Sequence, residues 1–312
     1  MRKVGVIGGS GYIGSHVTKK FLQEGYKVKV SSTDIGDKSK YNHLLNLPES
    51  ENLEVSPLNI EDKKLLESFI KDCEILIHGG TPFRLEVEDP EKDMFNPPVK
   101  GTENFLEAVK KSPSVKKVLF IASVAALNAA FPLPADNQKS DHIDSEEDEP
   151  FIKAEHLPYT QAKHYADQTV RSFIKNNPEI KFEILSVYPT LVVGSPLSKT
   201  RKSESVESQV VFKKNEAPTP LIQMLFDMDV EFAMVDVEDV AKAIYKAAIK
   251  ENNHGEKYLL SSESFKISDI HRMMNDQKPK NSSIFKYSGK KAEKELGLNF
   301  QSVDIPLSSF SV

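Results

Sequence analysis

A glycine-rich turn follows the first apolar run of the chain. The run is Lys3–Ile7, the turn reads Gly8-Gly9-Ser10-Gly11-Tyr12-Ile13-Gly14, and a helical apolar pattern comes directly after it. Glycines allow such a turn to approach a ligand closely. The first N–H groups of the following helix are oriented to bind an anion. A strand, turn and helix in this order predict a site for the pyrophosphate of a dinucleotide, with Gly8, Ser10, Gly11, Tyr12, Ile13 and Gly14 as the residues that line it.

Strands alternate with helices along about the first 190 residues. Short apolar runs typical of buried strands lie at Lys3–Ile7, Lys27–Ser31, Leu53–Pro57, Glu74–His78, Lys117–Ala122 and Phe182–Val187. Helical patterns lie between them, around Ile13–Leu22, Tyr41–Leu47, Lys64–Ile70, Glu103–Val109 and Tyr159–Lys175. This alternation predicts an α/β fold with a Rossmann-type, doubly wound parallel sheet.

The regular alternation ends after residue 190. The segment Gly194–Pro220 is rich in Ser, Lys and Pro and is interpreted as a loop region. We expect Phe232–Val235 and the helical pattern Val237–Ile249 to return to the main body, and Tyr258–Leu260 and later elements to form a small lobe. The predicted division is a dinucleotide-binding domain of 1–187 plus about 232–255, and a substrate lobe of about 188–231 plus 256–312.

Composition excludes several classes of protein. The 312 residues carry a net charge of −5, so the overall field does not favour nucleic acid. The single cysteine, Cys73, excludes an internal disulfide framework, and the histidines show no spacing typical of zinc ligands, so we expect no metal. No apolar run approaches the roughly 20 residues of a membrane span, and the N-terminus does not resemble a signal peptide. We therefore expect a cytoplasmic protein without a membrane partner.

The residues after the second predicted strand bear on the choice of cofactor. An acid there binds the ribose hydroxyls of NAD, whereas a base accepts the 2′-phosphate of NADP. The tip, Ser32-Thr33, is neutral, and Lys40 lies shortly after it. This pattern favours NADP, with NAD left open because Asp34 is a possible ribose ligand.

A tyrosine and a lysine lie four residues apart on a predicted helix. Tyr159 and Lys163 therefore share one helix face. A nearby cation favours the phenolate, so we expect Lys163 to lower the pKa of Tyr159 toward the working range of an acid–base catalyst. Ser123 ends the run Phe120-Ile121-Ala122-Ser123 and is expected at the carboxyl edge of the sheet, where ligands bind.

Together these residues resemble the extended short-chain dehydrogenase/reductase family, within the NAD(P)-dependent epimerase/dehydratase superfamily. The resemblance covers nearly the whole chain and is greatest to the branch of dihydroflavonol reductase, anthocyanidin reductase, cinnamoyl-CoA reductase and microbial aldehyde/ketone reductases. The segments that mark it are Gly8–Gly14, His43-Leu44-Leu45, Cys73 through Thr81-Pro82-Phe83, Asp89-Pro90-Glu91, Phe120–Ser123, Tyr159 with Lys163, and Tyr188–Gly194.

The resemblance implies roles for single residues. Ser123 would bind the substrate carbonyl oxygen, Tyr159 would protonate it, and Lys163 would hold the nicotinamide ribose. The other cofactor contacts that the family implies are Ser32, Thr33 and Lys40 at the 2′-phosphate, Asn59 and Ile60 at the adenine, Gly79, Gly80 and Thr81 along the cofactor, and Pro189, Leu191 and Val192 against the nicotinamide. Asn128 would touch the substrate.

The chain departs from the family pattern at two positions. NADP-using relatives usually carry Arg where this chain has Thr33, although Lys40 matches a second basic position. Asp236 stands where relatives often have His.

The resemblance implies an NADP-dependent carbonyl reductase acting on a small molecule, as a monomer or homodimer. Three alternatives remain. The first is an NAD-dependent nucleotide-sugar epimerase or dehydratase, for which Arg201, Lys202, Lys213 and Lys214 are candidate diphosphate ligands. The second is a hydroxysteroid-type dehydrogenase, and the third is a non-enzymatic sensor of cofactor redox state.

Overall fold

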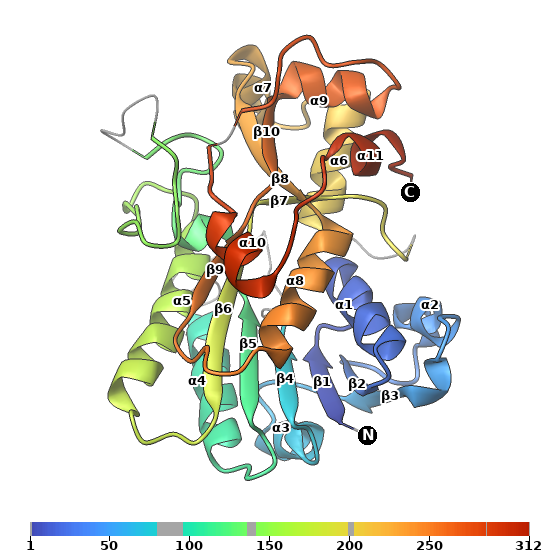
Figure 1. Ribbon diagram of the computed structural model, residues 1–312, viewed down its shortest axis with the longest axis vertical. Coiled ribbons are helices and arrows are strands. Elements are labelled where there is room, and N and C mark those ends of the chain that lie inside the picture. The colour runs from blue at the N-terminus through green and yellow to red at the C-terminus, as the bar shows by residue number, and fades with distance from the viewer. Residues whose placement is uncertain (1, 80–95, 136–141, 199–202, 285, 312) are drawn as a thin grey trace.

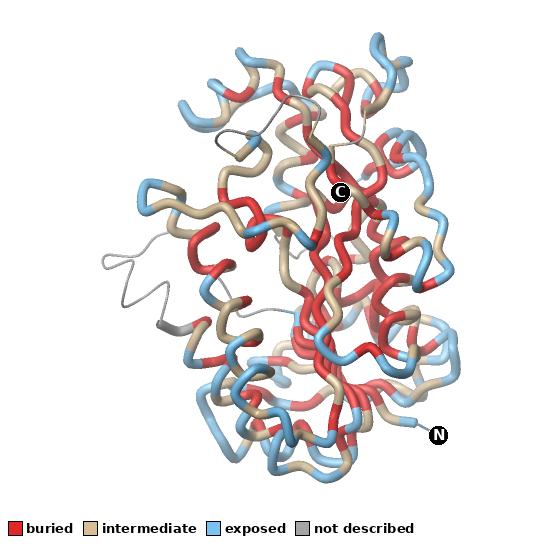
Figure 2. Tube along the Cα trace, turned by 60° about the vertical axis from the view of Figure 1, so that its left-hand side comes forward, coloured by how far each residue is buried: buried red, intermediate tan, exposed pale blue. Residues whose placement is uncertain are grey.

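The computed structural model describes residues 2–79, 96–135, 142–198, 203–284 and 286–311. Within this part, the chain forms a large parallel sheet flanked by helices and a second, smaller sheet at its carboxyl end (Figure 1). The buried strands of the large sheet run through the middle of the molecule, while most loops at its lower end are exposed (Figure 2).

The large sheet has seven strands among the described residues, in the order β3-β2-β1-β4-β5-β6-β9, and every neighbouring pair is parallel. The order reverses between β1 and β4, where a ligand is expected in an open α/β sheet. This confirms the predicted doubly wound fold. The strands are β1 (Lys3–Ile7), β2 (Lys27–Ser32), β3 (Leu53–Pro57), β4 (Ile75–His78), β5 (Lys117–Ile121), β6 (Glu183–Pro189) and β9 (Lys257–Leu260).

Helices cover both faces of this sheet. On one face, α1 (Tyr12–Gln23) packs against α8 (Val237–Ile249), and their apolar residues join the sheet in the larger core cluster. On the other face lie α3 (Lys63–Ile70), α4 (Asn96–Lys110) and α5 (Pro158–Asn176), which share a second cluster. Burial of apolar surface on both faces explains why the strands read as continuous apolar runs.

The second sheet has the order β10-β8-β7 among the described residues. Its strands are β7 (Leu191–Val193), β8 (Glu231–Asp236) and β10 (Glu263–Lys266). The helices around it are α6 (Glu204–Lys214), α7 (Pro220–Asp227), α9 (Ile267–Met274) and α11 (Asp304–Ser308), while α10 (Lys290–Leu296) packs on β9 and α8. The lobe therefore stands above the carboxyl edge of the large sheet, where β6 continues into β7 (Figure 1).

Two of the expected elements are placed differently by the structure. The strand that contains Phe232–Val235 pairs in the small sheet, and the strand that contains Tyr258–Leu260 pairs with β6 in the large one. Both expectations were wrong because a short buried apolar run carries no signal for which sheet it joins. The division of the chain into two domains stays a prediction.

The predicted loop region Gly194–Pro220 also needs correction, because it contains the helix α6. On its buried side this helix carries Gln209, which is fully covered and accepts a hydrogen bond from the Gly194 N–H at 2.8 Å. A polar residue at a buried position interrupts the apolar pattern by which a helix is recognised. The predicted helix Tyr41–Leu47 is shorter than expected, with α2 covering Asn42–Leu45 between the 3₁₀ turns η1 (Lys38–Lys40) and η2 (Ser50–Asn52).

In the described residues, every helix is either too short or too polar to span a bilayer.

Candidate active site

The glycine turn is built for close backbone contact. Gly8 has φ +76°, and its N–H donates to the Ser31 hydroxyl at 2.9 Å. A Cβ on Gly14 would lie 2.0 Å from the Gly8 carbonyl oxygen, so a side chain there would force the turn open. Helix α1 begins just after Gly11, which provides no side-chain cap to the N–H groups of the first turn. These uncapped donors and the tight backbone fit the pyrophosphate of a dinucleotide.

The other residues of the turn contribute through the backbone. Ser10 and Tyr12 are buried, and the Tyr12 hydroxyl donates to the Gly194 carbonyl at 2.7 Å. Tyr12 thus connects the turn to the first residue after β7. Because its side chain is used in this contact, Tyr12 would bind the pyrophosphate through its backbone N–H.

The tip of β2 favours a phosphate over a ribose hydroxyl. The carboxylate of Asp34 turns back into its own loop, where it accepts a hydrogen bond from the Gly36 N–H at 2.9 Å. The Lys40 ammonium lies 3.3 Å from the Thr33 hydroxyl, which is exposed. The Ser32 hydroxyl is buried and donates to the Asp34 carbonyl, so Ser32 shapes the loop.

The predicted adenine residues follow β3. Asn59 is exposed, and its side-chain oxygen accepts a hydrogen bond from the Glu61 N–H at 3.1 Å, while Ile60 is half-buried. Gly79 follows β4, and its N–H donates to the Ile7 carbonyl at 2.9 Å, which keeps it beside the glycine turn. Gly80 and Thr81 lie outside the described residues.

Ser123 and the Tyr159–Lys163 pair meet where β5 ends. Ser123 caps the 3₁₀ turn η4 (Val124–Ala126), accepting a hydrogen bond from the Ala125 N–H at 3.2 Å, and η4 packs against α5. On α5, the Lys163 ammonium lies over the Tyr159 ring, 5.4 Å from its centroid. The structure therefore brings together on one surface an ammonium, a phenol and the turn that carries a hydroxyl.

A fourth group, Glu204, joins this cluster from the second lobe. Its carboxylate is exposed and interacts electrostatically with Tyr159 and with Lys163. Burial and this carboxylate raise the pKa of Tyr159 above its ordinary value. The expectation that Lys163 lowers this pKa was therefore wrong. Desolvation lowers the pKa of Lys163, and Glu204 opposes that shift.

Two side chains that the sequence did not single out hold the site in place. His164 Nδ1 lies 3.1 Å from the Ala126 carbonyl oxygen, which fastens the Ser123 turn to α5. The Gln161 amide donates to the carbonyls of Ala154 and His156, which fixes the loop before α5. The His164 contact joins residues 38 positions apart in the chain, so no local motif reveals it.

The predicted substrate and nicotinamide residues differ in accessibility. Asn128 is buried, and its amide donates to the Leu133 carbonyl and the Tyr287 hydroxyl, each at 2.9 Å. Pro189 is buried at the end of β6. Leu191 is half-buried, whereas Val192, which faces the opposite side of β7, is 2% exposed in the main core.

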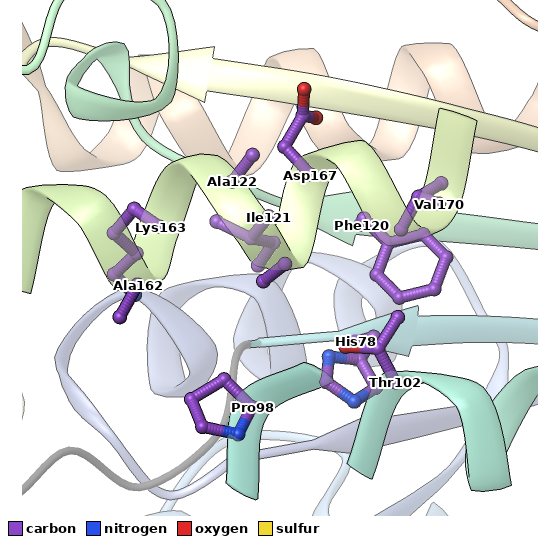
Figure 3. Close-up of a pocket in the computed structure, with 11 residues that line it drawn as sticks. His78, Pro98, Thr102, Phe120, Ile121, Ala122, Ala162, Lys163, Asp167 and Val170 are labelled. Atoms are coloured by element: carbon purple, nitrogen blue, oxygen red, sulfur yellow. The ribbon is translucent and has the colours of Figure 1, made fainter. Parts of the chain in front are cut away.

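A small cavity lies beneath α5, the helix that carries Tyr159 and Lys163 (Figure 3). It holds about 50 Å³, which is far below the size of a ligand pocket but enough for water. Its walls come from α4, α5, β4 and β5, and burial lowers the pKa of His78 in this wall to about 4. The lining residues are His78, Pro98, Thr102, Phe120, Ile121, Ala122, Ala162, Lys163, Ala166, Asp167 and Val170.

One group of possible metal ligands occurs among the described residues. The ligand atoms of His142, Asp144 and Asp148 lie within 4.8 Å of one another. Asp148 also accepts a hydrogen bond from the Ser145 N–H at 2.6 Å, as expected of a residue that closes a surface turn.

Comparison with known proteins gives a consistent result. The model of the NAD dependent epimerase/dehydratase family matches residues 4–261. Anthocyanidin reductase of Arabidopsis thaliana is 31% identical over 285 residues, which are 89% of this chain and 81% of the relative.

Two solved structures have the same fold. The yeast methylglyoxal/isovaleraldehyde reductase Gre2 complexed with NADPH aligns with a TM-score of 0.81 at 24% identity, covering 98% of this chain and 96% of that one. Gre2 of Candida albicans, also in complex with NADPH, aligns with a TM-score of 0.82 at 24% identity, covering 99% and 97%. The family match, the reductase relative and the glycine turn agree with one another. The chain belongs to the NAD dependent epimerase/dehydratase family of extended short-chain dehydrogenases/reductases and is an NAD(P)-dependent oxidoreductase.

Proposed function

We propose that this protein is an NADPH-dependent carbonyl reductase that converts a small aldehyde or ketone to an alcohol. The observation that carries the proposal is the cluster of Tyr159, Lys163 and the Ser123 turn, which lies at the same carboxyl edge of the sheet as the glycine turn. A phenol that can give up a proton next to a nicotinamide site is the arrangement that carbonyl reduction requires.

The first turn of α1 and the glycine turn would hold the pyrophosphate. At the other end of the cofactor, Thr33 and Lys40 would hold the 2′-phosphate. The Asp34 carboxylate supports this choice because its Oδ1 already accepts a hydrogen bond from the Gly36 N–H. The two Gre2 structures, which hold NADPH, agree with it.

When bound, NADPH supplies a hydride to the carbonyl carbon. Tyr159 gives its proton to the carbonyl oxygen as the C=O π bond breaks, so that one C–H and one O–H bond form. The raised pKa of Tyr159 keeps the phenol protonated at neutral pH, which suits a proton donor. Ser123 would donate a second hydrogen bond to the same oxygen, and the Lys163 ammonium would stabilise the phenolate left on Tyr159.

The proposal is tested with NADPH that carries deuterium at the transferable position of nicotinamide C4. A panel of neutral aldehydes and ketones is incubated with the protein, and the products are analysed by mass spectrometry. We expect alcohols with deuterium on the former carbonyl carbon. Absence of alcohol across the panel, or alcohol without deuterium, would contradict the proposal.

A further inference from the structure

Two side chains of α1 bind two consecutive carbonyl oxygens just after β7. The Tyr12 hydroxyl donates to the Gly194 oxygen at 2.7 Å, and His16 Nε2 lies 3.2 Å from the Ser195 oxygen. Tyr12 and His16 are both buried, and their spacing of four residues places them on one face of the helix. We call them the Tyr12–His16 pair and call Gly194 with Ser195 the corner. The helix that begins at the glycine turn is therefore joined to the corner at two points.

His16 donates hydrogen bonds through both of its ring nitrogens. A carbonyl oxygen can only accept, so Nε2 donates to Ser195. On the other side of the ring, Nδ1 lies 3.1 Å from Oε1 of Glu238, in the first turn of α8. Hydrogen bonds from His16 and Lys19 lower the pKa of Glu238 to about 2, so this carboxylate is ionised and also accepts. With an acceptor at each nitrogen, the buried ring is held in one orientation and its bonds are charge-assisted.

The corner is also attached to the second lobe. The Gly194 N–H donates to the side-chain oxygen of Gln209, a fully buried residue of α6, at 2.8 Å. The Ser195 hydroxyl donates to the Ser309 carbonyl at 3.1 Å and accepts from the Ser311 N–H at 3.0 Å. A movement of the corner would therefore displace α6 and the C-terminal segment with it.

The corner follows the part of the chain that borders the proposed nicotinamide site. In the proposed reaction the nicotinamide lies beside Ser123 and Tyr159, at the carboxyl end of β5. Strand β6 is a parallel neighbour of β5, and its carboxyl end continues through Thr190 into β7 and the corner. The pyrophosphate, in contrast, would be held by the glycine turn and the first N–H groups of α1. The Tyr12–His16 pair thus joins the helix at the pyrophosphate to the segment beside the nicotinamide.

We propose that Tyr12 and His16 are positioning residues that align the nicotinamide half of the cofactor site with the adenosine half. The pair holds the corner, and with it the end of β6 and the second lobe, in a fixed position relative to the glycine turn. This inference rests on the proposed function for the location of the nicotinamide. It gives the two side chains a role in cofactor binding that is separate from that of the backbone N–H groups of α1.

The affinities for the whole cofactor and for its adenosine half test the inference. Titration calorimetry measures the dissociation constants of NADPH and of adenosine 2′,5′-bisphosphate, which has both phosphates of the adenosine half but no nicotinamide. In His16→Phe we expect NADPH to bind about tenfold more weakly than in the wild type, while the affinity for the bisphosphate stays within about twofold. Tyr12→Phe, which removes one hydroxyl, should change the ratio of the two constants in the same direction. His16→Gln, whose amide can still donate, should recover most of the NADPH affinity.

His271→Phe is the matched control. His271 Nδ1 lies 3.0 Å from the Phe212 carbonyl oxygen, so this histidine makes the same kind of contact, but within the second lobe. Both of its affinities should equal those of the wild type. If His16→Phe does not fold, Tyr12→Phe decides the test. An unchanged ratio of the two constants in the folded variants of the pair, including an equal loss for both ligands, would overturn the inference.

Turnover separates failure of the inference from failure of the proposed function. Both ligands bind without a reaction, so their affinities test the inference even if no aldehyde or ketone is reduced, and that result would contradict the proposed function alone. If carbonyl compounds are reduced and the ratio of the two dissociation constants is unchanged in the variants of the pair, the proposed function stands and the inference fails.

Discussion

The Asp34 carboxylate and the Lys40 ammonium are close in sequence but make different contacts. Asp34 closes its own turn on Gly36, whereas Lys40 lies beside the exposed hydroxyl of Thr33. A phosphate bound at this tip would take its charge-assisted hydrogen bond from Lys40. Recognition of the 2′-phosphate should therefore depend on this lysine.

We predict that Lys40→Ala weakens NADPH binding about tenfold, equivalent to about 1.4 kcal/mol, and leaves NADH binding unchanged. Nicotinamide fluorescence titration of the purified protein measures both affinities. Lys27→Ala, at the amino end of β2, is the control and should bind both cofactors as the wild type does. An equal loss of affinity for NADPH and for NADH would mean that Lys40 does not bind the 2′-phosphate.

His78 should make the protein sensitive to mild acid. It is buried between Phe105 and Phe120, and burial lowers its pKa from 6.5 to about 4. The folded protein therefore binds fewer protons at this residue than the unfolded chain between these two pH values. The contribution of His78 to the free energy of unfolding is fully present above about pH 6.5, and it decreases as the pH falls toward 4.

The loss should reach the order of 3 kcal/mol at pH 4. We predict that the urea-unfolding free energy of His78→Leu changes less across this pH range than that of the wild type. His142→Asn, which changes a half-exposed surface histidine, should retain the wild-type pH dependence. Parallel pH curves for His78→Leu and the wild type would show that His78 is not the sensitive group.

At the active site, local sequence predicted some residues and not others. Tyr159 and Lys163 are one helical turn apart, so their spacing alone predicts that they interact. Glu204 comes 41 residues after Lys163 and reaches Tyr159 only because the second lobe folds over the sheet edge. A contact of this kind depends on tertiary packing and has no signature along the chain.

At the scale of elements, the position of Ser123 depends on how η4 is attached to α5. The contact between His164 Nδ1 and the Ala126 carbonyl oxygen links η4 to α5. Loss of this link should let the Ser123 turn move relative to Tyr159. Misplacement of a reacting group lowers turnover more than cofactor affinity.

We predict that His164→Phe lowers kcat about tenfold while the affinity for NADPH stays within about twofold. His164→Asn, whose amide nitrogen can replace Nδ1, should recover most of the activity. Steady-state kinetics and fluorescence titration provide the two readouts. Equal losses of kcat and NADPH affinity in both variants would indicate a general structural defect instead.

The order of strands and helices in the first 190 residues was predictable because buried parallel strands are short apolar runs between helical patterns. Strands β1 and β3 have the predicted bounds, and several others differ by one residue. Helix α6 was not predictable, because Gln209 lies on its buried side and Ser and Lys occupy much of its surface. The sheets that β8 and β9 join were not predictable either, because strand pairing depends on the arrangement of the whole chain.

At the scale of the whole molecule, the two sheets share one apolar core. The larger cluster contains Val4 and Val28 from the large sheet together with Phe232 and Met234 from the small one. Tyr12 adds a hydrogen bond between the glycine turn and Gly194. A shared core of this kind favours unfolding of both lobes as one unit.

We therefore predict a single urea-unfolding transition by circular dichroism and by tyrosine fluorescence. NADPH at about 100 times its dissociation constant should stabilise the protein by about 2.7 kcal/mol, because only the folded chain binds it. Two separate transitions, with only the first part of the chain stabilised by NADPH, would show that the lobes are independent.

The proposed mechanism depends on Tyr159 as the proton donor, and replacement of Tyr159 by Phe tests this role most directly. Single-turnover reduction of a neutral ketone that the wild type accepts should slow about 10²–10⁴-fold in Tyr159→Phe, while NADPH binds with wild-type affinity. Tyr165→Phe, on an exposed position of the same helix, should react at the wild-type rate. A near-normal rate in Tyr159→Phe would contradict the assignment of Tyr159 as the proton donor.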